Sequence, residues 1–137
     1  QGFANVEYLA ASILDMDWHT LDADAEVQDV NQFEDQSMNE IGLIPEILPR
    51  YRSTYFAHIF SGGYSAGYYV YKWAEVLDAD AFNAFKESGD IFNQKLAEKF
   101  RQHCLAEVGE DEPMKQYKKF RGQEPSIDPL LEKLGFD

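Results

Sequence analysis

The chain has 137 residues, enough for one domain around a single hydrophobic core, and 45% of them are hydrophobic. Aromatic residues make up 15% of the sequence, which excludes a chain that is disordered throughout, because disordered proteins are poor in aromatic side chains. The formal net charge of −13 argues against nucleic acid as a partner, since neutralising phosphates requires clustered Lys and Arg.

The first third of the sequence predicts two helices and a loop. Over residues 5–21 the apolar side chains recur at steps of three and four, which is the period of an amphipathic helix. A second helix is predicted over roughly residues 25–39, where Asp22 or Asp24 can cap its N-terminus. Prolines within residues 41–50 predict a loop, because proline interrupts a helix.

The rest of the sequence continues the helical pattern. Residues 51–60 are rich in aromatic and β-branched side chains, and an extended stretch and a helix are both compatible with them. The longest helix is predicted over residues 64–86, followed by a helix over 92–109 and a short one over 114–122. A last helical turn is predicted over residues 130–134, so the chain is expected to be all-α.

Neither a self-contained zinc site nor an activated nucleophile is visible in the sequence. The histidines His19, His58 and His103 form no His-Glu-x-x-His pair, which would place two zinc ligands on one helix face. Cys104 has only the adjacent His103, which points to a different side of a helix. We therefore predict no metal ligand and no nucleophilic chemistry from these residues.

A segment rich in glycine and tyrosine is the most distinctive feature of the sequence. Residues 61–71 read Ser-Gly-Gly-Tyr-Ser-Ala-Gly-Tyr-Tyr-Val-Tyr. On a helix Tyr64, Tyr68 and Tyr71 share one face, and phenolic hydroxyls can donate hydrogen bonds to a developing oxyanion. The two glycines before the first tyrosine allow close approach of a ligand or of another backbone. The residues alone leave open an ordinary role of this row in core or interface packing.

Several spaced motifs carry a resemblance to a known family. Residues 51–82 contain the glycine–tyrosine segment, residues 120–125 read Phe-Arg-Gly-Gln-Glu-Pro, and residues 129–135 read Pro-Leu-Leu-Glu-Lys-Leu-Gly. Together with Gly-Phe-Ala and Tyr-Leu-Ala-Ala-Ser-Ile-Leu-Asp-Met within residues 2–16, they resemble the zinc oligopeptidase family of thimet oligopeptidase, oligopeptidase A and peptidyl-dipeptidase. The resemblance covers essentially the whole chain. Residues 107–113 depart from it, because the family more often has paired glycines and a serine there.

The resemblance implies a large, mainly helical, two-lobed zinc metallopeptidase that hydrolyses short oligopeptides. Residues 1–137 would form a single helical domain at its C-terminal end. In such enzymes zinc polarises the scissile carbonyl for attack by water. The zinc ligands and the general-base glutamate would come from the missing N-terminal part of the same polypeptide, so this chain alone is expected to bind no catalytic zinc and to be inactive.

The resemblance also implies the residues of the site. His58 occupies the position of a substrate-binding histidine, and Tyr64 and Tyr71 those of two tyrosines that stabilise the tetrahedral intermediate. Tyr68 matches another tyrosine of the same segment. The predicted catalytic residues are therefore Tyr64 and Tyr71, and the predicted substrate-binding residues are His58, Gly62, Gly63 and Tyr68.

Alternatives to this interpretation stay open. Residues 51–60 resemble the peptidyl-dipeptidase branch, which releases C-terminal dipeptides, whereas residues 73–82 resemble oligopeptidase A, an endopeptidase, about as well. A hypothesis from another class is a non-catalytic helical module that binds a peptide or protein through the tyrosine face. A purely structural domain would bury Tyr64 and Tyr71 with satisfied hydroxyls.

The expected partners are a short peptide substrate and the N-terminal part of the same polypeptide. Without that part, exposed apolar surface predicts self-association of the chain. No apolar run approaches the roughly 18 to 20 residues that cross a bilayer, so no membrane partner is expected. The single cysteine excludes an intramolecular disulfide and permits a reducing compartment; we expect a cytoplasmic protein, with the periplasm as the alternative.

Overall fold

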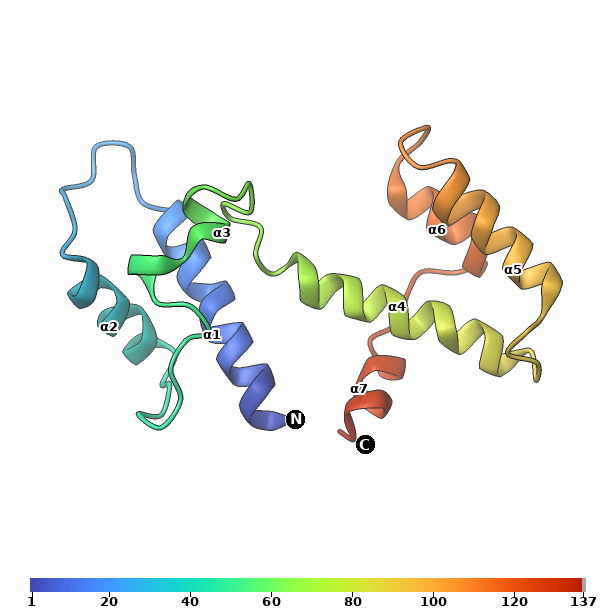
Figure 1. Cartoon of the computed structure of the whole chain (residues 1–137), viewed down its shortest axis with the longest axis horizontal. Coiled ribbons are helices and arrows are strands. Elements are labelled where there is room, and N and C mark those ends of the chain that lie inside the picture. Colours follow the sequence, from blue (N-terminus) through green and yellow to red (C-terminus); the bar gives the residue numbers. More distant parts are fainter. Residues whose placement is uncertain (137) are drawn as a thin grey trace. The chain divides into compact units, whose positions relative to one another are not determined.

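The computed structural model describes residues 1–136, which contain seven α-helices and no strand (Figure 1). This confirms the predicted all-α fold. The chain consists of two compact units, each with its own hydrophobic core: unit 1 is Gln1–Tyr71 and unit 2 begins at Lys72. That the whole chain acts as one domain stays a prediction. Among the described helices, none combines the length and the apolar character needed to cross a membrane.

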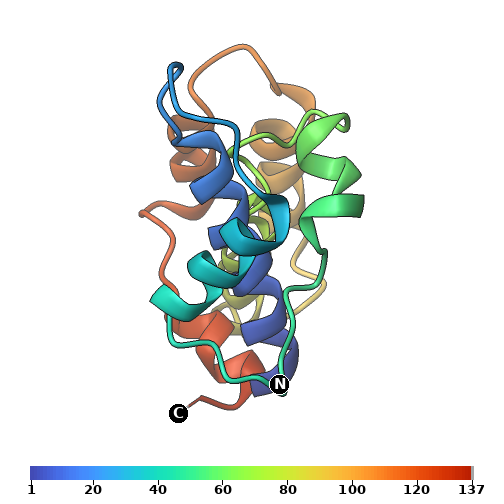
Figure 2. The ribbon, with the colours of Figure 1, turned by 90° about the vertical axis from the view of Figure 1, so that its left-hand side faces the viewer.

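Unit 1 is built on α1 (Gly2–His19), and α2 (Val30–Glu40) lies against it (Figures 1 and 2). Ala10 and Leu14 of α1 meet Met38 of α2 in one buried cluster. These positions of α1 belong to the apolar stripe that predicts the helix, and this part of the stripe is buried in unit 1.

The start of α2 differs from the prediction. Asp29 caps this helix, because its carboxylate accepts hydrogen bonds from the backbone N–H groups of Asn31 and Gln32. Neither Asp22 nor Asp24 has that role, and the helix begins five residues later than expected. Asp22, Asp24 and Asp29 are all of a residue type that caps helices, and the sequence does not distinguish among them.

The segment between α2 and the tyrosines folds into turns and short helical pieces. Residues 41–50 are a loop, as predicted, and the backbone N–H of Arg50 donates to the carbonyl of Glu7 on α1 at 3.1 Å. The undecided residues 51–60 are helical rather than extended: a 3-10 turn, η1 (Ser53–Tyr55), precedes the short helix α3 (Ala57–Phe60).

Helix α4 (Val70–Glu87) starts six residues later than the predicted helix at 64–86. Ala66 has a φ of +52°, a left-handed conformation that does not fit a right-handed helix. The N–H of Gly67 bonds to the carbonyl of Tyr64 at 2.8 Å and that of Val70 to the carbonyl of Gly67 at 3.1 Å, so two tight turns precede the helix. Tyr64 and Tyr68 therefore lie outside α4.

Unit 2 contains the rest of α4 and three further α-helices. α5 (Gln94–Phe100) runs into a π-helical turn, η2 (Arg101–Ala106), which together replace the predicted helix over 92–109. α6 (Pro113–Arg121) ends at the left-handed Gly122 and α7 (Asp128–Leu134) at Gly135, close to the predicted ends. The two buried clusters of this unit are Ala84 with Tyr117 and Phe120, and Val76 with Ala79 and Leu130.

Candidate functional site

The predicted histidine and tyrosines come together in unit 1. His58 lies on α3, Tyr64 and Tyr68 lie in the turns before α4, and Tyr71 lies in its first turn. The ring centroids are 5.8 Å apart for His58 and Tyr64, 5.5 Å for His58 and Tyr68, and 5.6 Å for Tyr68 and Tyr71. We call these four residues the tyrosine–histidine cluster.

Tyr64 and Tyr71 have the closest rings of the cluster. Their rings stack with centroids 5.3 Å apart and an interplanar angle of 23°. The hydrogen bond with Tyr64 is the largest of the causes that raise the pKa of Tyr71 to about 12. At neutral pH this phenol keeps its proton, as an ordinary tyrosine also does, and can act as a hydrogen-bond donor.

This pair does not match the structural-domain alternative. Tyr71 is 40% exposed and Tyr64 is half-buried, so neither ring is enclosed in the core of unit 1. An exposed phenol pair that stays protonated can meet a ligand, which a buried pair cannot do.

Tyr68 differs from its neighbours because its ring is in the core. It is 3% exposed and packs with Ala11, Phe56 and Ile59, and its ring stacks on that of Tyr8 at 5.1 Å. Burial is the main cause that raises the pKa of the Tyr68 phenol, and the nearby Arg50 opposes it. Its contacts make Tyr68 a support of the other rings, while its substrate-binding role stays a prediction.

The two glycines before Tyr64 are required by the path of the chain. A Cβ atom on Gly62 would lie 2.9 Å from both Cα and the carbonyl oxygen of His58, so only glycine fits without a shift of the backbone. Gly63 has a φ of +79°, in the left-handed region. The close approach predicted for this pair is therefore made by the chain itself, and contact with a substrate stays a prediction.

A buried aspartate that we did not predict lies beneath the cluster. Asp15 on α1 is fully buried, and its carboxylate accepts hydrogen bonds from the backbone N–H groups of Ala66 and Tyr68, each at 2.9 Å. His19 Nδ1 lies 2.9 Å from the same carboxylate. A signal was present in the sequence: Asp15 comes four residues after Ala11, which places an acid on the apolar face of the helix.

Comparison with known proteins identifies the family. The family model for peptidase family M3 matches residues 1–136. The chain belongs to peptidase family M3. It is 41% identical to the dipeptidyl carboxypeptidase of Salmonella typhimurium over its whole length, which is 20% of that protein. It is 52% identical to oligopeptidase A of Escherichia coli over 80 residues, 58% of this chain and 12% of that protein. A probable cytosolic oligopeptidase A of Arabidopsis thaliana is 38% identical over 95% of this chain and 19% of that protein.

These matches confirm the resemblance to the zinc oligopeptidase family that the sequence motifs indicated. This M3 chain spans about a fifth of the length of the dipeptidyl carboxypeptidase that it matches. The tyrosine–histidine cluster lies within the matched part of the chain.

The described part of this M3 chain does not fit a zinc ion. Residues 1–136 contain no group of three or more His, Cys, Asp or Glu side chains placed to hold a metal. His19 and His103 each lie against one carboxylate, Asp15 and Glu107, at 2.9 and 3.0 Å. A catalytic zinc needs three protein ligands, so these pairs do not supply a site.

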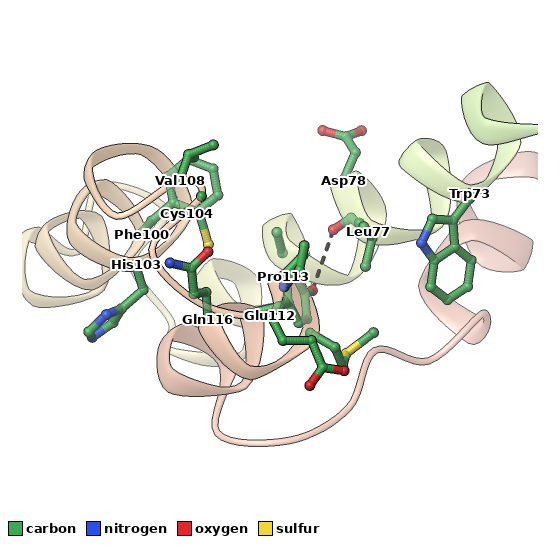
Figure 3. A pocket seen from close by; sticks show the side chains of 14 residues that line it. Trp73, Leu77, Asp78, Phe100, His103, Cys104, Val108, Glu112, Pro113 and Gln116 are labelled. Atoms are coloured by element: carbon green, nitrogen blue, oxygen red, sulfur yellow. Dashed lines mark hydrogen bonds between the residues drawn. The ribbon is translucent and has the colours of Figure 1, made fainter. Parts of the chain in front are cut away.

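Unit 2 of the M3 chain holds a separate apolar pocket of about 650 Å³ (Figure 3). Leu77, Phe100 and Cys104 are among its lining residues, and burial raises the pKa of the Cys104 thiol. In Figure 3 the imidazole of His103 points away from this thiol, and it pairs with Glu107 instead. The predicted lack of a thiol–imidazole pair agrees with this geometry.

Proposed function

We propose that this chain forms part of a metallopeptidase that hydrolyses short peptides. In this proposal His58 binds the substrate, and Tyr64 and Tyr71 donate hydrogen bonds to the oxyanion of the tetrahedral intermediate. The observation that carries the proposal is the stacked Tyr64–Tyr71 pair, with Tyr71 40% exposed, beside His58. Donors that are already oriented before the reaction stabilise developing charge without a reorganisation cost.

Release of C-terminal dipeptides is the activity that we propose first. The match to a dipeptidyl carboxypeptidase over the whole chain supports it. Internal cleavage is the alternative, supported by the higher identity to oligopeptidase A over 80 residues and by the plant relative of that name. Gly62, Gly63 and Tyr68 complete the proposed substrate-binding set in either case.

We propose that the zinc ion, its ligands and the general-base glutamate belong to another part of the polypeptide. The lack of a metal-binding group among residues 1–136 and the fivefold greater length of the relatives support this division. The residues of this chain then bind and orient the peptide and hold two protons at the phenol oxygens of Tyr64 and Tyr71.

The remaining polypeptide is also the partner that we propose for the exposed apolar surface. Phe3 and Phe60 in unit 1 and Phe82 and Phe92 in unit 2 are each more than half exposed. Burying such side chains is favourable, so an isolated chain is expected to self-associate. Light scattering that finds only monomers over a wide concentration range would contradict this part of the proposal.

Hydrolysis of a short quenched peptide tests the proposed activity. The 137-residue chain should be inactive, and the full-length polypeptide that contains it should be active with stoichiometric zinc. In the full-length form Tyr71→Phe should lower kcat by about 100- to 1000-fold, the effect of losing one oxyanion donor. Tyr69→Phe is the matched control, because Tyr69 is an adjacent tyrosine that is 54% exposed and lies outside the cluster.

Two outcomes would show that the chemistry is assigned wrongly. One is equal activity of the isolated chain and of the full-length protein, and the other is an equal effect of Tyr71→Phe and Tyr69→Phe. Mass spectrometry of the products then separates the two activities, since C-terminal dipeptides and internal fragments differ in mass.

A further inference from the structure

Asp15 is a fully buried carboxylate on α1 whose partners come from a distant part of unit 1. One carboxylate oxygen accepts the N–H of Ala66 and the other that of Tyr68, each at 2.9 Å and more than fifty residues away in sequence. Burying a charge is costly unless hydrogen bonds replace its water. The full set of partners explains why an acid is tolerated on the apolar face of this helix.

The turn that Asp15 binds is one that the backbone does not favour by itself. Ala66 is the non-glycine residue with positive φ among the described residues, and a Cβ atom makes the left-handed conformation unfavourable. Such a conformation persists where the surrounding structure determines it. Here the Asp15 carboxylate holds the conformation through two charge-assisted hydrogen bonds, one from the N–H of Ala66 and one from that of Tyr68.

The same turn connects the two phenols of the site. Tyr64 lies two residues before Ala66, and Tyr71 lies three residues after Tyr68, so the bonds to Asp15 fall between them. The hydroxyl of Tyr8, also on α1, donates to the carbonyl of Tyr68. α1 thereby holds both polar backbone groups of Tyr68, close to the point where α4 begins.

We propose that Asp15 is a positioning residue of this peptidase: its carboxylate fixes the turn at residues 64–70 so that Tyr64 and Tyr71 stack and present their hydroxyls together. It touches neither substrate nor reacting atoms, and acts through the backbone at Ala66 and Tyr68. The consequence for turnover rests on the proposed function, whereas the consequence for the position of the two rings does not.

Glu34 provides a matched control within unit 1. It is also a buried carboxylate, 3% exposed, and it too accepts a backbone N–H, that of Ser53 at 2.7 Å. Its partners are Ser53 of η1 and Arg52 just before it, which forms an ion pair with Glu34, and neither lies in the turn before α4. Glu34→Gln and Asp15→Asn each replace a buried carboxylate by an amide, and only the second touches the turn.

Nuclear Overhauser contacts between the rings of Tyr64 and Tyr71, measured in the 137-residue chain, give the first test. Asp15→Asn keeps the size of the side chain but turns one acceptor into an NH₂ group that faces a donor. We expect the ring contact to weaken by about threefold or more in Asp15→Asn, because the turn loses one of its two anchoring bonds. The same contact should be retained in Glu34→Gln. An undiminished contact in Asp15→Asn overturns the proposal.

His19→Ala provides a second variant if Asp15→Asn does not fold. His19 is on the rim of unit 1 with a side chain that is 24% exposed, and its Nδ1 lies 2.9 Å from the Asp15 carboxylate. Its Nδ1 also lies 2.8 Å from the backbone carbonyl of Asp15, so its removal leaves both N–H bonds to the turn in place and takes away one contact of the carboxylate. The ring contact should weaken in the same direction as in Asp15→Asn, and an unchanged contact counts against the proposal.

A double-mutant cycle in the full-length peptidase gives the second test. Asp15→Asn should lower kcat by about 10- to 100-fold with little change in KM, since a small misplacement of a catalytic group has effects of that size. In a Tyr71→Phe background Asp15→Asn should lower kcat by less than about twofold, because the hydroxyl that Asp15 positions is gone. Glu34→Gln should have the same factor in both backgrounds.

The two tests separate the positioning role from the proposed function. Equal factors for Asp15→Asn in the two backgrounds mean that Asp15 is a structural residue, and the positioning proposal fails. A Tyr71→Phe variant with normal turnover refutes the proposed role of Tyr71, while the ring contact in the isolated chain still decides whether Asp15 positions the pair.

Discussion

The ionisation of Tyr71 gives a direct measure of the phenol pair on which the proposed function depends. Its pKa is about 12 against an ordinary 10.0, with the hydrogen bond to Tyr64 as the largest cause, followed by burial and by the charge of Tyr64. A difference of this size corresponds to an ionisation constant about 100-fold below that of a free phenol. Tyr64→Phe removes the first and third causes and leaves the second, so we expect the pKa of Tyr71 to fall from about 12 toward 10.0.

Titration of ¹³Cζ-labelled tyrosine by NMR measures this change. Tyr69→Phe is the control, because it removes a phenol of the same segment that is 54% exposed and outside the cluster. Tyr69→Phe should not change the pKa of Tyr71. A Tyr71 pKa that stays near 12 in Tyr64→Phe would refute the reasoning, because the causes that survive the substitution would then carry the whole effect.

The same shift has a consequence for stability at high pH. Because the pKa of Tyr71 is higher in the folded chain than the ordinary 10.0, the folded state binds more protons than the unfolded state between 10.0 and about 12. The contribution is fully present below pH 10.0 and is lost as the pH rises through about 12. Tyr64→Phe should therefore make stability less dependent on pH in this window.

Three further predictions concern other parts of the chain. Tyr117→Phe should lower the free energy of unfolding of unit 2 by about 1.5–3 kcal/mol, since its hydroxyl donates to the buried Asp80 at 2.5 Å; urea titration followed at 5-fluorotryptophan checks this, and an unchanged midpoint contradicts it. Gly62→Ala should weaken the ring contact of the phenol pair, because its Cβ meets the α3 backbone at 2.9 Å, whereas Gly2→Ala, in open space, should not. Cys104 should react with iodoacetamide at pH 7.5 severalfold more slowly than free cysteine, because burial raises its pKa; a rate equal to that of free cysteine argues against it.

The helices of this chain were largely predictable, whereas two of their starts were not. Apolar periodicity indicates where a helix has a face to bury, as in α1 and α6. It contains no information on a hydrogen bond from the Asp15 carboxylate to Ala66, fifty-one residues away. That bond stabilises a left-handed residue within an apolar pattern, and so the predicted helix at 64–86 begins only at Val70.

The residues of the candidate site were predicted by resemblance, and the structure adds that its tyrosines differ in burial. Periodicity treats Tyr64, Tyr68 and Tyr71 alike, because it gives each of them a position on one face. In the structure Tyr68 is 3% exposed and Tyr71 is 40% exposed. The difference depends on Tyr8 and on the carboxylate of Asp15, which come from α1 and hold the backbone of Tyr68 in the core. The periodicity of one segment does not predict contacts of this kind with a distant segment.

A regular helix from Tyr64 onward would have kept the two phenols apart. Seven residues of α-helix rise about 10.5 Å, which exceeds the roughly 4.5–7 Å between the centroids of two rings in contact. The observed ring centroids are 5.3 Å apart, because the turns at Ala66 and Gly67 bring Tyr64 back over the start of α4. The departure from helical structure is thus what brings the two rings into contact. Gly62 and Asp15 fix that departure from its two sides, and both matter to the site through the path of the backbone.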